Sequence, residues 1–593
     1  MIAPMTRYAF ILLKGEERGL LEKLQELGLV DISRTARPVD AHSEELAREV
    51  ERLDGLIRSL RRAEIPENTA PVPVEGAPET AARELLERQA DLTQRIGQQR
   101  KEAEALRVWG RFDPSLLQRL EEAGVPVRFH CLAGKAFREE WAESCALSVI
   151  ARDKGKVWFV VAGDDPLPGE IPAPRGDAAR AEAALRALEQ EESVLLGHLA
   201  GVRERIGEIE ALRAQTYAQL DLYLAGQTAV SAAEDSIVTL VGYSTTETEA
   251  AVTAALDQTG VFYFKAPAAA EDNPPVALKN NWFVRQFEVL TDMYGRPAYD
   301  GFDPTPYISV FFLLFFAFCM GDCGYGLILL AAGLLLRKTE RFKDMAPLVT
   351  LLGAGTTVIG FLFHTFFSVD ISGWEIFRPV RGIFLPGKIA GYDGTMVLSI
   401  IVGVFHLCLA MCVKTYEETR HKGFLNVLGT WGWTLLLVGG VITGALALTG
   451  VLDKTITRWT VIVLGTVSAL GIFVFNDPKR SKLVNVGAGL WDTYNTVSGL
   501  LGDVLSYLRL YALGLAGSML GLAFNSIGLM ILGDGSQPLL WIPFVAIVVI
   551  GHTLNIAMAA LGAFVHPLRL NFLEFFKNSG YEARGRNFNP LSK

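Results

Sequence analysis

The chain has 593 residues, half of them hydrophobic, and a formal net charge of −9 at pH 7. It is too long for a single domain, and its mean hydropathy of +0.27 is too apolar for a purely soluble protein. The acidic balance argues against a nucleic-acid-binding protein.

An α/β pattern opens the chain. A β-like apolar run over 7–13 is followed by helical spacing over 16–27 and a second short run over 30–33. A strand–helix–strand pattern returns over 236–265, so we expect 1–40 and 230–270 to form one α/β lobe near the membrane, the proximal lobe. The first residues lack a basic n-region, a long apolar stretch and a cleavage site, so we expect no signal peptide.

Two stretches with coiled-coil spacing follow, at 41–108 and 176–228. Apolar residues recur there every three or four positions between charged flanks. We expect the stretches to fold back on each other as an antiparallel coiled coil; an ordinary helical bundle is the alternative. Between them, 109–172 alternates strand-like and helical pieces and predicts a distal α/β lobe. No P-loop, GxGxxG or HExxH motif occurs, so 1–285 is interpreted as a cytoplasmic strut and not a catalytic domain.

A proline-interrupted linker over 271–307 leads to the second part of the chain. Residues 283–294 predict a helix lying along the membrane surface. Pro304 and Pro306 stop any helix before the first apolar run.

Residues 308–593 predict an all-α, polytopic membrane domain. The apolar run 308–336 holds Gly321-Asp322-Cys323-Gly324-Tyr325-Gly326 in its middle, which predicts a tight hairpin of two spans. Further apolar segments bring the expected number of spans to about eight; they are 346–368, 395–413, 424–450, 458–475, 490–533 and 539–576. Lysine and arginine are richer near 337–343, 414–422 and 479–482, in the loops on the side of the soluble part. Both termini are therefore expected in the cytoplasm.

One full positive charge, Arg509, lies in the apolar segment of about forty residues that we expect to form a long tilted helix. An arginine there costs at least a few kcal/mol, so by default it marks a functional site that faces protein or water. The alternatives are a structural arginine neutralised by a neighbouring helix and one that snorkels to the headgroups. Asp503, Ser506 and Tyr507 precede it.

The last apolar segment carries six polar residues: His552, Asn555, His566, Arg569, Asn571 and Glu574. Asn555, His566 and Arg569 share a face of an ideal helix, although Pro567 can bend it. Glu574 lies about 140° round from Arg569 in the same geometry, so we do not expect the two to pair on one face. Its place near the cytoplasmic end suggests a solvated carboxylate. Two arginines with titratable groups nearby suggest an ion path more than a ligand pocket.

At this point the residues resemble a known family. The run Ser506-Tyr507-Leu508-Arg509-Leu510-Tyr511-Ala512-Leu513 is similar to the signature of subunit a, also called subunit I, of V-type and A-type rotary ATPases. Three other runs agree with it: Pro274-Pro275-Val276-Ala277-Leu278-Lys279-Asn280, the glycine-rich hairpin motif above, and His566-Pro567-Leu568-Arg569-Leu570-Asn571-Phe572-Leu573-Glu574.

The resemblance implies a static membrane subunit beside a rotating proteolipid ring whose members each bear an ion-binding carboxylate. Two aqueous half-channels would open to opposite sides, and Arg509 and Arg569 occupy the positions of the family's two essential arginines. The remaining candidate lining residues are Asp503, Ser506, Tyr507, His552, Asn555, His566, Asn571 and Glu574.

The resemblance also implies partners and a location. The soluble part would be a stator arm that binds peripheral-stalk subunits, a central-stalk adaptor and, through the stalks, the catalytic ATPase head. The chain itself would be a non-catalytic, multi-pass protein of the cell membrane, in contact with lipid and without a cofactor. The six cysteines form no CxxC pair beside histidines, which favours reduced thiols over a metal site.

Two other classes of protein fit parts of the pattern. A stand-alone secondary transporter with a coiled-coil regulator would have inverted repeats and broken helices at mid-membrane, and the spans show no convincing internal repeat. A membrane scaffold with purely structural arginines is the third interpretation. Proton and sodium are both candidate ions.

Overall fold

The computed structural model describes residues 1–34, 38–66, 68–110, 114–153, 155–163, 166–173, 178–232, 236–339, 342–389, 391–475, 481–533 and 537–592. Parts of two basic loops of the sequence analysis, 340–341 and 476–480, lie outside these residues. The chain divides into two compact units, Ile11–Leu240 with Leu591–Lys593, and Met1–Phe10 with Val241–Pro590.

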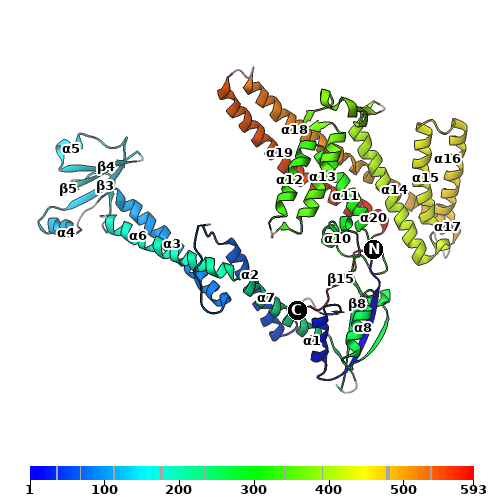
Figure 1. Cartoon of the computed structure of the whole chain (residues 1–593). Helices are drawn as coiled ribbons and strands as arrows, with labels where there is room; N and C mark the ends of the chain where they lie inside the picture. The colour runs from blue at the N-terminus through cyan, green and yellow to red at the C-terminus, as the bar shows by residue number, and fades with distance from the viewer. Residues whose placement is uncertain are drawn as a thin grey trace. The chain divides into compact units, whose positions relative to one another are not determined.

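The first unit is built on paired antiparallel helices. Helix α2 (Ala41–Arg62) packs along α7 (Ile206–Gly226), and α3 (Pro78–Arg107) packs along α6 (Ala178–Glu204), as Figure 1 shows. Their buried apolar residues include Leu53, Leu60, Leu199, Val202 and Ile209. Ion pairs such as Arg61–Glu210 and Arg88–Glu191 flank these seams. The two predicted stretches are thus helical and packed together, whereas a coiled-coil supercoil stays a prediction.

A four-stranded sheet with strand order β4-β5-β3-β6 lies between α3 and α6 in the chain. Val157, Phe159 and Val161 are buried on one face of its strand β5, as the alternation along that strand requires. The elements of this lobe are α4 (Pro114–Glu122), β3 (Val127–Ala133), α5 (Trp141–Ser144), β4 (Leu147–Asp153), β5 (Lys156–Ala162) and β6 (Glu170–Ile171).

A five-stranded sheet with the order β2-β8-β1-β9, with β7 paired to β8, combines strands from both ends of the soluble part. The α/β patterns near residue 20 and residue 250 therefore do meet in one sheet. Its strands and helices are β1 (Met5–Leu13), α1 (Glu17–Leu27), β2 (Asp31–Ile32), β7 (Val230–Ala232), β8 (Ile237–Thr245), α8 (Glu249–Asp257) and β9 (Phe262–Pro267).

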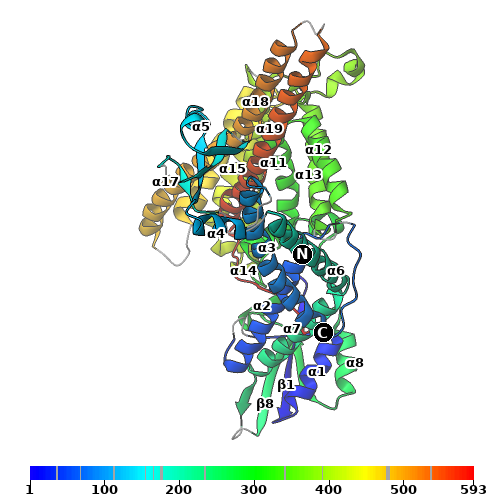
Figure 2. The ribbon, with the colours of Figure 1, turned by 90° about the vertical axis from the view of Figure 1, so that its left-hand side faces the viewer.

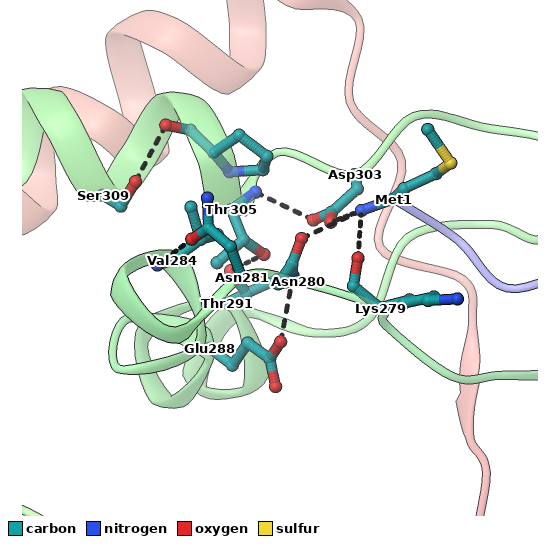
Figure 3. Close-up of polar contacts among 11 residues, drawn as sticks. Met1, Lys279, Asn280, Asn281, Val284, Glu288, Thr291, Asp303, Thr305 and Ser309 are labelled. Atoms are coloured by element: carbon teal, nitrogen blue, oxygen red, sulfur yellow. Dashed lines mark hydrogen bonds and ion pairs between the residues drawn. The ribbon is translucent and has the colours of Figure 1, made fainter.

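The linker holds short elements joined by polar contacts. Strand β10 (Pro275–Val276) pairs in parallel with β15 (Arg586–Asn587) near the C-terminus. The predicted helix over 283–294 is instead two short helices, α9 (Trp282–Arg285) and α10 (Glu288–Tyr294). The Met1 ammonium binds the Asp303 carboxylate and, at 2.9 Å, the Asn280 side chain (Figure 3).

Among the described residues, five helical segments are long enough and apolar enough to cross a membrane: Gly394–Lys422, Leu428–Leu448, Lys454–Val474, Leu483–Leu532 and Pro538–Ser579. They contain α14 (Gly394–Lys422), α15 (Leu428–Leu448), α16 (Lys454–Ala469), α17 (Lys482–Ser506), α18 (Leu508–Leu532), α19 (Trp541–Arg569) and α20 (Phe576–Ser579). Three shorter apolar helices precede them: α11 (Thr305–Met320), α12 (Cys323–Leu336) and α13 (Ala346–Leu362). Whether these three also cross, giving eight spans, stays a prediction.

The hairpin predicted at the glycine-rich motif is present between α11 and α12. Gly321 ends α11 in the left-handed region (φ 56°), and Asp322 caps the start of α12. Helix α11 packs on α13, α18 and α19 and only slightly on α12. Helix α12 packs mainly on α13, and the two lie side by side in Figures 1 and 2. Glycines make this approach possible, because a Cβ on Gly360 would lie 2.2 Å from the Cys323 nitrogen.

The expected long helix is present as one helical segment, Leu483–Leu532, with a break in its regular hydrogen-bond pattern at Tyr507. Helices α17 and α18 meet at Tyr507, two residues before Arg509. The last segment is interrupted as well, since a π-helical turn, η7 (Leu570–Phe575), separates α19 from α20. Both irregularities fall on the motifs that carry the candidate site.

Candidate functional site

The candidate residues lie on α17 to α20, and the pair α18 and α19 runs side by side in both views (Figures 1 and 2). They fall into two groups. His552 and Asn555 are in one, and His566 is in the other, about 16 Å further along the helix. We call the second group the arginine cluster; it consists of Asp503, Ser506, Arg509, His566, Arg569, Asn571 and Glu574.

Arg509 lies in the first turn of α18. Its Nη1 atom is buried and, among the described residues, has no hydrogen-bond partner. His566 of α19 lies within electrostatic range of both Arg509 and Arg569, and Cys319 of α11 is close to Arg509. Two guanidinium groups from different helices therefore lie within electrostatic range of one imidazole.

Glu574 is not the solvated carboxylate that its position suggested, because only 4% of it is exposed. It lies in the π-helical turn, where each N–H bonds five residues back, as the Phe576 N–H does to the Asn571 carbonyl. Residues five apart are neighbours in such a turn, so the expected angle of about 140° between Arg569 and Glu574 does not apply. Pro567, which lacks an N–H, lies just before the turn.

Several polar atoms around this turn are buried without a hydrogen-bond partner in the described residues. They include Glu574 Oε2, Asn571 Oδ1 and His566 Nδ1. The Ser506 hydroxyl lies within reach of the Glu574 carboxylate. A buried set of donors and acceptors with spare capacity can bind water or an ion, which a fully satisfied set cannot.

Asp503 anchors the end of α17 to α20. Its carboxylate accepts a hydrogen bond from Asn578 Nδ2 at 2.8 Å and pairs with Lys577 Nζ at 3.4 Å. Asp503 is thus a neighbour of the Glu574 turn, and its expected place on the cytoplasmic side stays a prediction.

Tyr507 makes its hydrogen bond outside the arginine cluster, on α14. It is fully buried, and its hydroxyl is 2.9 Å from Nδ1 of His406 on α14. His406 was missed by the sequence analysis, although a lone histidine inside the apolar run 395–413 was a visible signal.

His552 and Asn555 belong to a second group, the histidine network, with Tyr325 of α12 and Asn525 of α18. Asn525 donates to the Phe367 carbonyl (2.9 Å), so its Oδ1 accepts from His552 Nε2 (2.9 Å). His552 Nδ1 then accepts from the Tyr325 hydroxyl (2.7 Å), whose oxygen accepts from Asn555 Nδ2 (2.8 Å). These four hydrogen bonds therefore run in one direction, from Asn555 through Tyr325, His552 and Asn525 to the Phe367 carbonyl.

Asp322 supports this network from the hairpin. Its carboxylate accepts from the backbone N–H groups of Tyr325 (3.1 Å), Phe367 (3.0 Å) and Ser368 (2.6 Å). The last two lie in a loop with left-handed backbone at non-glycine residues, with φ of 47° at Phe367 and 60° at Ser368. The carboxylate therefore holds a strained loop against the start of α12.

Comparisons with known proteins show which family the sequence resembles. The V-type ATPase 116kDa subunit family matches residues 206–375 and 493–593, which include the hairpin motif and the arginine cluster. The chain is therefore similar to subunit I of the V-type and A-type ATP synthases. V-type ATP synthase subunit I 1 of Treponema pallidum is 26% identical over 647 aligned positions that cover all of both chains.

Two archaeal relatives are more similar over a shorter stretch. The A-type ATP synthase subunits I of Methanocaldococcus jannaschii and Pyrococcus horikoshii are 30% and 32% identical, over 55% and 54% of this chain. The alignments span about half the length of those relatives, 50% and 48%. A crystal structure of the cytoplasmic N-terminal domain of a V-ATPase subunit I covers 45% of this chain at 17% identity. Its TM-score of 0.21 is too low to show a shared fold. With its five apolar helices, this relative of subunit I is a multi-pass membrane protein.

Proposed function

We propose that the chain is the static membrane subunit of a rotary V/A-type ATPase or ATP synthase, where it forms ion half-channels against a rotating proteolipid ring. The observation that carries the proposal is Arg509, whose buried Nη1 has no partner among the described residues in an apolar helix of a subunit I relative. A charge left without an internal counter-ion is available to a carboxylate supplied from outside the chain.

The physical role of such an arginine is to change the ionisation of the passing carboxylate. An unpaired carboxylate in lipid is driven to its ion-loaded form, whereas a guanidinium beside it favours the ionised form and releases the ion. The same positive charge repels ions that would cross directly between the half-channels. Such a leak would dissipate about 2.3 kcal/mol per charge for each 100 mV of membrane potential.

The arginine cluster supplies groups for the cytoplasmic half-channel. The buried Glu574, with Ser506 and Asn571 beside it, would pass ions between the ring and the cytoplasmic side, where Asp503 lies. Arg569 and His566 would add positive charge and polarity around Arg509. His552 and Asn555 lie earlier on α19 than His566 and Arg569, and they would line or support the opposite half-channel.

The soluble part is proposed to be the stator arm. Residues 1–285 would hold a proximal lobe (1–40 with 230–270), arms (41–108 and 176–228) and a distal lobe (109–172) that binds peripheral-stalk subunits. A central-stalk adaptor and, through the stalks, the catalytic head would complete the contacts. The chain would be non-catalytic, reside in the cell membrane and keep both termini in the cytoplasm.

Purification of the tagged full chain from native membranes tests the proposal. We expect a proteolipid and ATPase subunits to co-purify with it, with ATP hydrolysis in the eluate. An Arg509→Ala variant should bring down the same subunits, since this side chain is not needed for folding. Recovery of the chain alone, with ion transport that does not require ATPase subunits, would instead favour a secondary transporter.

A further inference from the structure

His406 is a fully buried histidine that the proposed ion path does not use. It lies on α14, where its ring stacks on Phe575 at a centroid distance of 4.8 Å and an interplanar angle of 8°. Phe311 and Phe315 of α11 cover its other sides, at 4.1 and 5.2 Å. Apart from Tyr507, the rings that surround this imidazole are therefore phenylalanine rings, which have no polar atoms.

Within the described part of the chain, the hydrogen bond of the His406 side chain reaches the break in the long segment. Its Nδ1 is 2.9 Å from the hydroxyl of Tyr507, the residue that separates α17 from α18. The main chain at the break is tight, with the Tyr507 N–H bonded to the Val504 carbonyl and the Leu510 N–H bonded to the Tyr507 carbonyl. Arg509 lies inside this turn.

Helix α14 is shaped to receive the Tyr507 ring. Gly403, one turn before His406, leaves the space that the ring fills, because a Cβ there would lie 2.3 Å from Tyr507 Cγ. The bond gives the phenol and the imidazole Nδ1 a partner in this register, whereas Nε2 of His406 is buried without a partner among the described residues. Loss of the bond would leave a further polar group unpaired, which is costly in apolar surroundings. The pair therefore selects one position for the break.

The opposite contact reaches the second irregular element. Phe575, stacked on His406, is the last residue of the π-helical turn and follows Glu574 directly. One imidazole thus touches the element that presents Arg509 and the element that presents Glu574, while contacting neither charge.

We propose that His406 is a positioning residue that fixes Arg509 and Glu574 relative to each other, through its hydrogen bond to Tyr507 and its stack on Phe575. The inference rests on the proposed function, because it assigns His406 a part in ion movement. It requires no change in the protonation of His406.

Variants that remove the bond in two ways test the inference. His406→Phe keeps a ring for the stack but loses the hydrogen bond, and Tyr507→Phe removes one oxygen atom. In inverted membrane vesicles, we expect each to lower ion uptake per ATP hydrolysed about fivefold, the effect of one interhelical hydrogen bond on a conformational equilibrium. The double variant should be no worse than either single one, because all three lose the same bond.

Rescue and a matched control separate positioning from general damage. His406→Asn retains a polar atom near Nδ1 and should pump better than His406→Phe. Ser399→Ala removes another buried polar group of α14, one that bonds only to the Met396 carbonyl (2.8 Å), and should leave uptake per ATP unchanged. Subunit content is compared for all variants, and if His406→Phe does not assemble, Tyr507→Phe decides the test.

Normal uptake per ATP in Tyr507→Phe, losses that multiply in the double variant, or a His406→Asn variant no better than His406→Phe would overturn the inference. Arg509→Ala is measured in parallel, so that a failure of this inference can be distinguished from a failure of the proposed function. If it abolishes uptake while the His406 and Tyr507 variants pump normally, only this inference fails. If Arg509→Ala itself pumps normally, the proposed function fails.

Discussion

A guanidinium nitrogen buried without a hydrogen-bond partner costs about 1–3 kcal/mol or more. Arg7 and Arg296 have a nitrogen of this kind too, so Arg509 is distinguished by its place in an apolar helix. Nη1 of Arg509 is such an atom in the described part of the chain, and Glu574 Oε2 is its acidic counterpart in the π-helical turn. Both atoms have unused hydrogen-bonding capacity. At the scale of residues, the arginine cluster is therefore suited to binding transient partners. The side chains of the histidine network instead bind one another.

Asp322 gives the clearest stability prediction for a single residue. Asp322→Ala would leave three backbone N–H groups without their acceptor, and the side chain is only 4% exposed. We expect a loss of about 3 kcal/mol or more in the membrane domain, measured by thermal unfolding of the purified protein in detergent.

Asp393→Ala is the matched control. Asp393 also caps a helix, by accepting from the Thr395 N–H at 2.9 Å, but it is exposed. Its loss should cost about 1 kcal/mol or less. Equal destabilisation by the two variants would contradict the role given to Asp322.

Asp40 predicts a pH dependence in the soluble part. The Tyr223 hydroxyl, and then Ser43, donate to its carboxylate and lower its pKa from 3.8 to about 2. Because the pKa is lower in the folded state, the ionised carboxylate adds stability above about pH 4, and this stability is lost as the pH falls toward 2.

Tyr223→Phe removes the largest cause of the shift. The difference in melting temperature between native and variant chains should be present at pH 5 and shrink as the pH approaches 2. Tyr217→Phe, on the same helix, should show no such pH-dependent difference. A Tyr223→Phe deficit that is equal at both pH values would rule out the Asp40 linkage.

Single residues could be predicted where the local sequence alone makes them unusual, and not where their role depends on the tertiary structure. Arg509 was identifiable because a charge inside an apolar run is costly in any fold. The burial of Glu574 was not, since it depends on a π-helical turn that ideal-helix geometry does not contain. The Tyr325–His552 contact joins residues 227 positions apart, so no local pattern could indicate it.

Among the helices, the break between α17 and α18 depends on a neighbour. Tyrosine is no strong helix breaker, so the sequence around Tyr507 predicted a continuous helix. The break coincides with the insertion of the Tyr507 ring beside Gly403 of α14. Apolar runs thus predicted the segments well, but they could not predict an irregularity that another helix stabilises.

Gly403→Ala tests this packing. The new Cβ would lie 2.3 Å from the Tyr507 ring, so the ring or the helix must move, at an expected cost of about 1–3 kcal/mol. We expect a lower melting temperature and reduced ATP-driven ion uptake. Gly440→Ala on α15, where a Cβ meets nothing within 4 Å, should be neutral or stabilising. Equal behaviour of the two variants would contradict the account of the break.

At the scale of the whole molecule, the described residues comprise a first part with paired helices and two larger sheets and a second part with five helices long and apolar enough to cross a membrane. Heptad-like spacing predicts the paired helices and long apolar runs predict the membrane helices. Both are local patterns, so the division into two parts could be predicted from the sequence. Three apolar helices, α11 to α13, are shorter than the length criterion. They pack through glycines on one another and around the hairpin, so hydropathy could not fix their number of crossings.

The central claim is that Arg509 is the charge that faces a moving carboxylate. The most direct measurement is ATP-driven ion uptake into inverted vesicles, with and without sodium, for the native chain, Arg509→Ala and the control Arg458→Ala. Arg458 is an exposed arginine of another membrane helix, α16. With equal assembly, we predict that uptake is lost in Arg509→Ala and kept in Arg458→Ala. Normal pumping by Arg509→Ala in an intact complex would make this arginine structural and contradict the account.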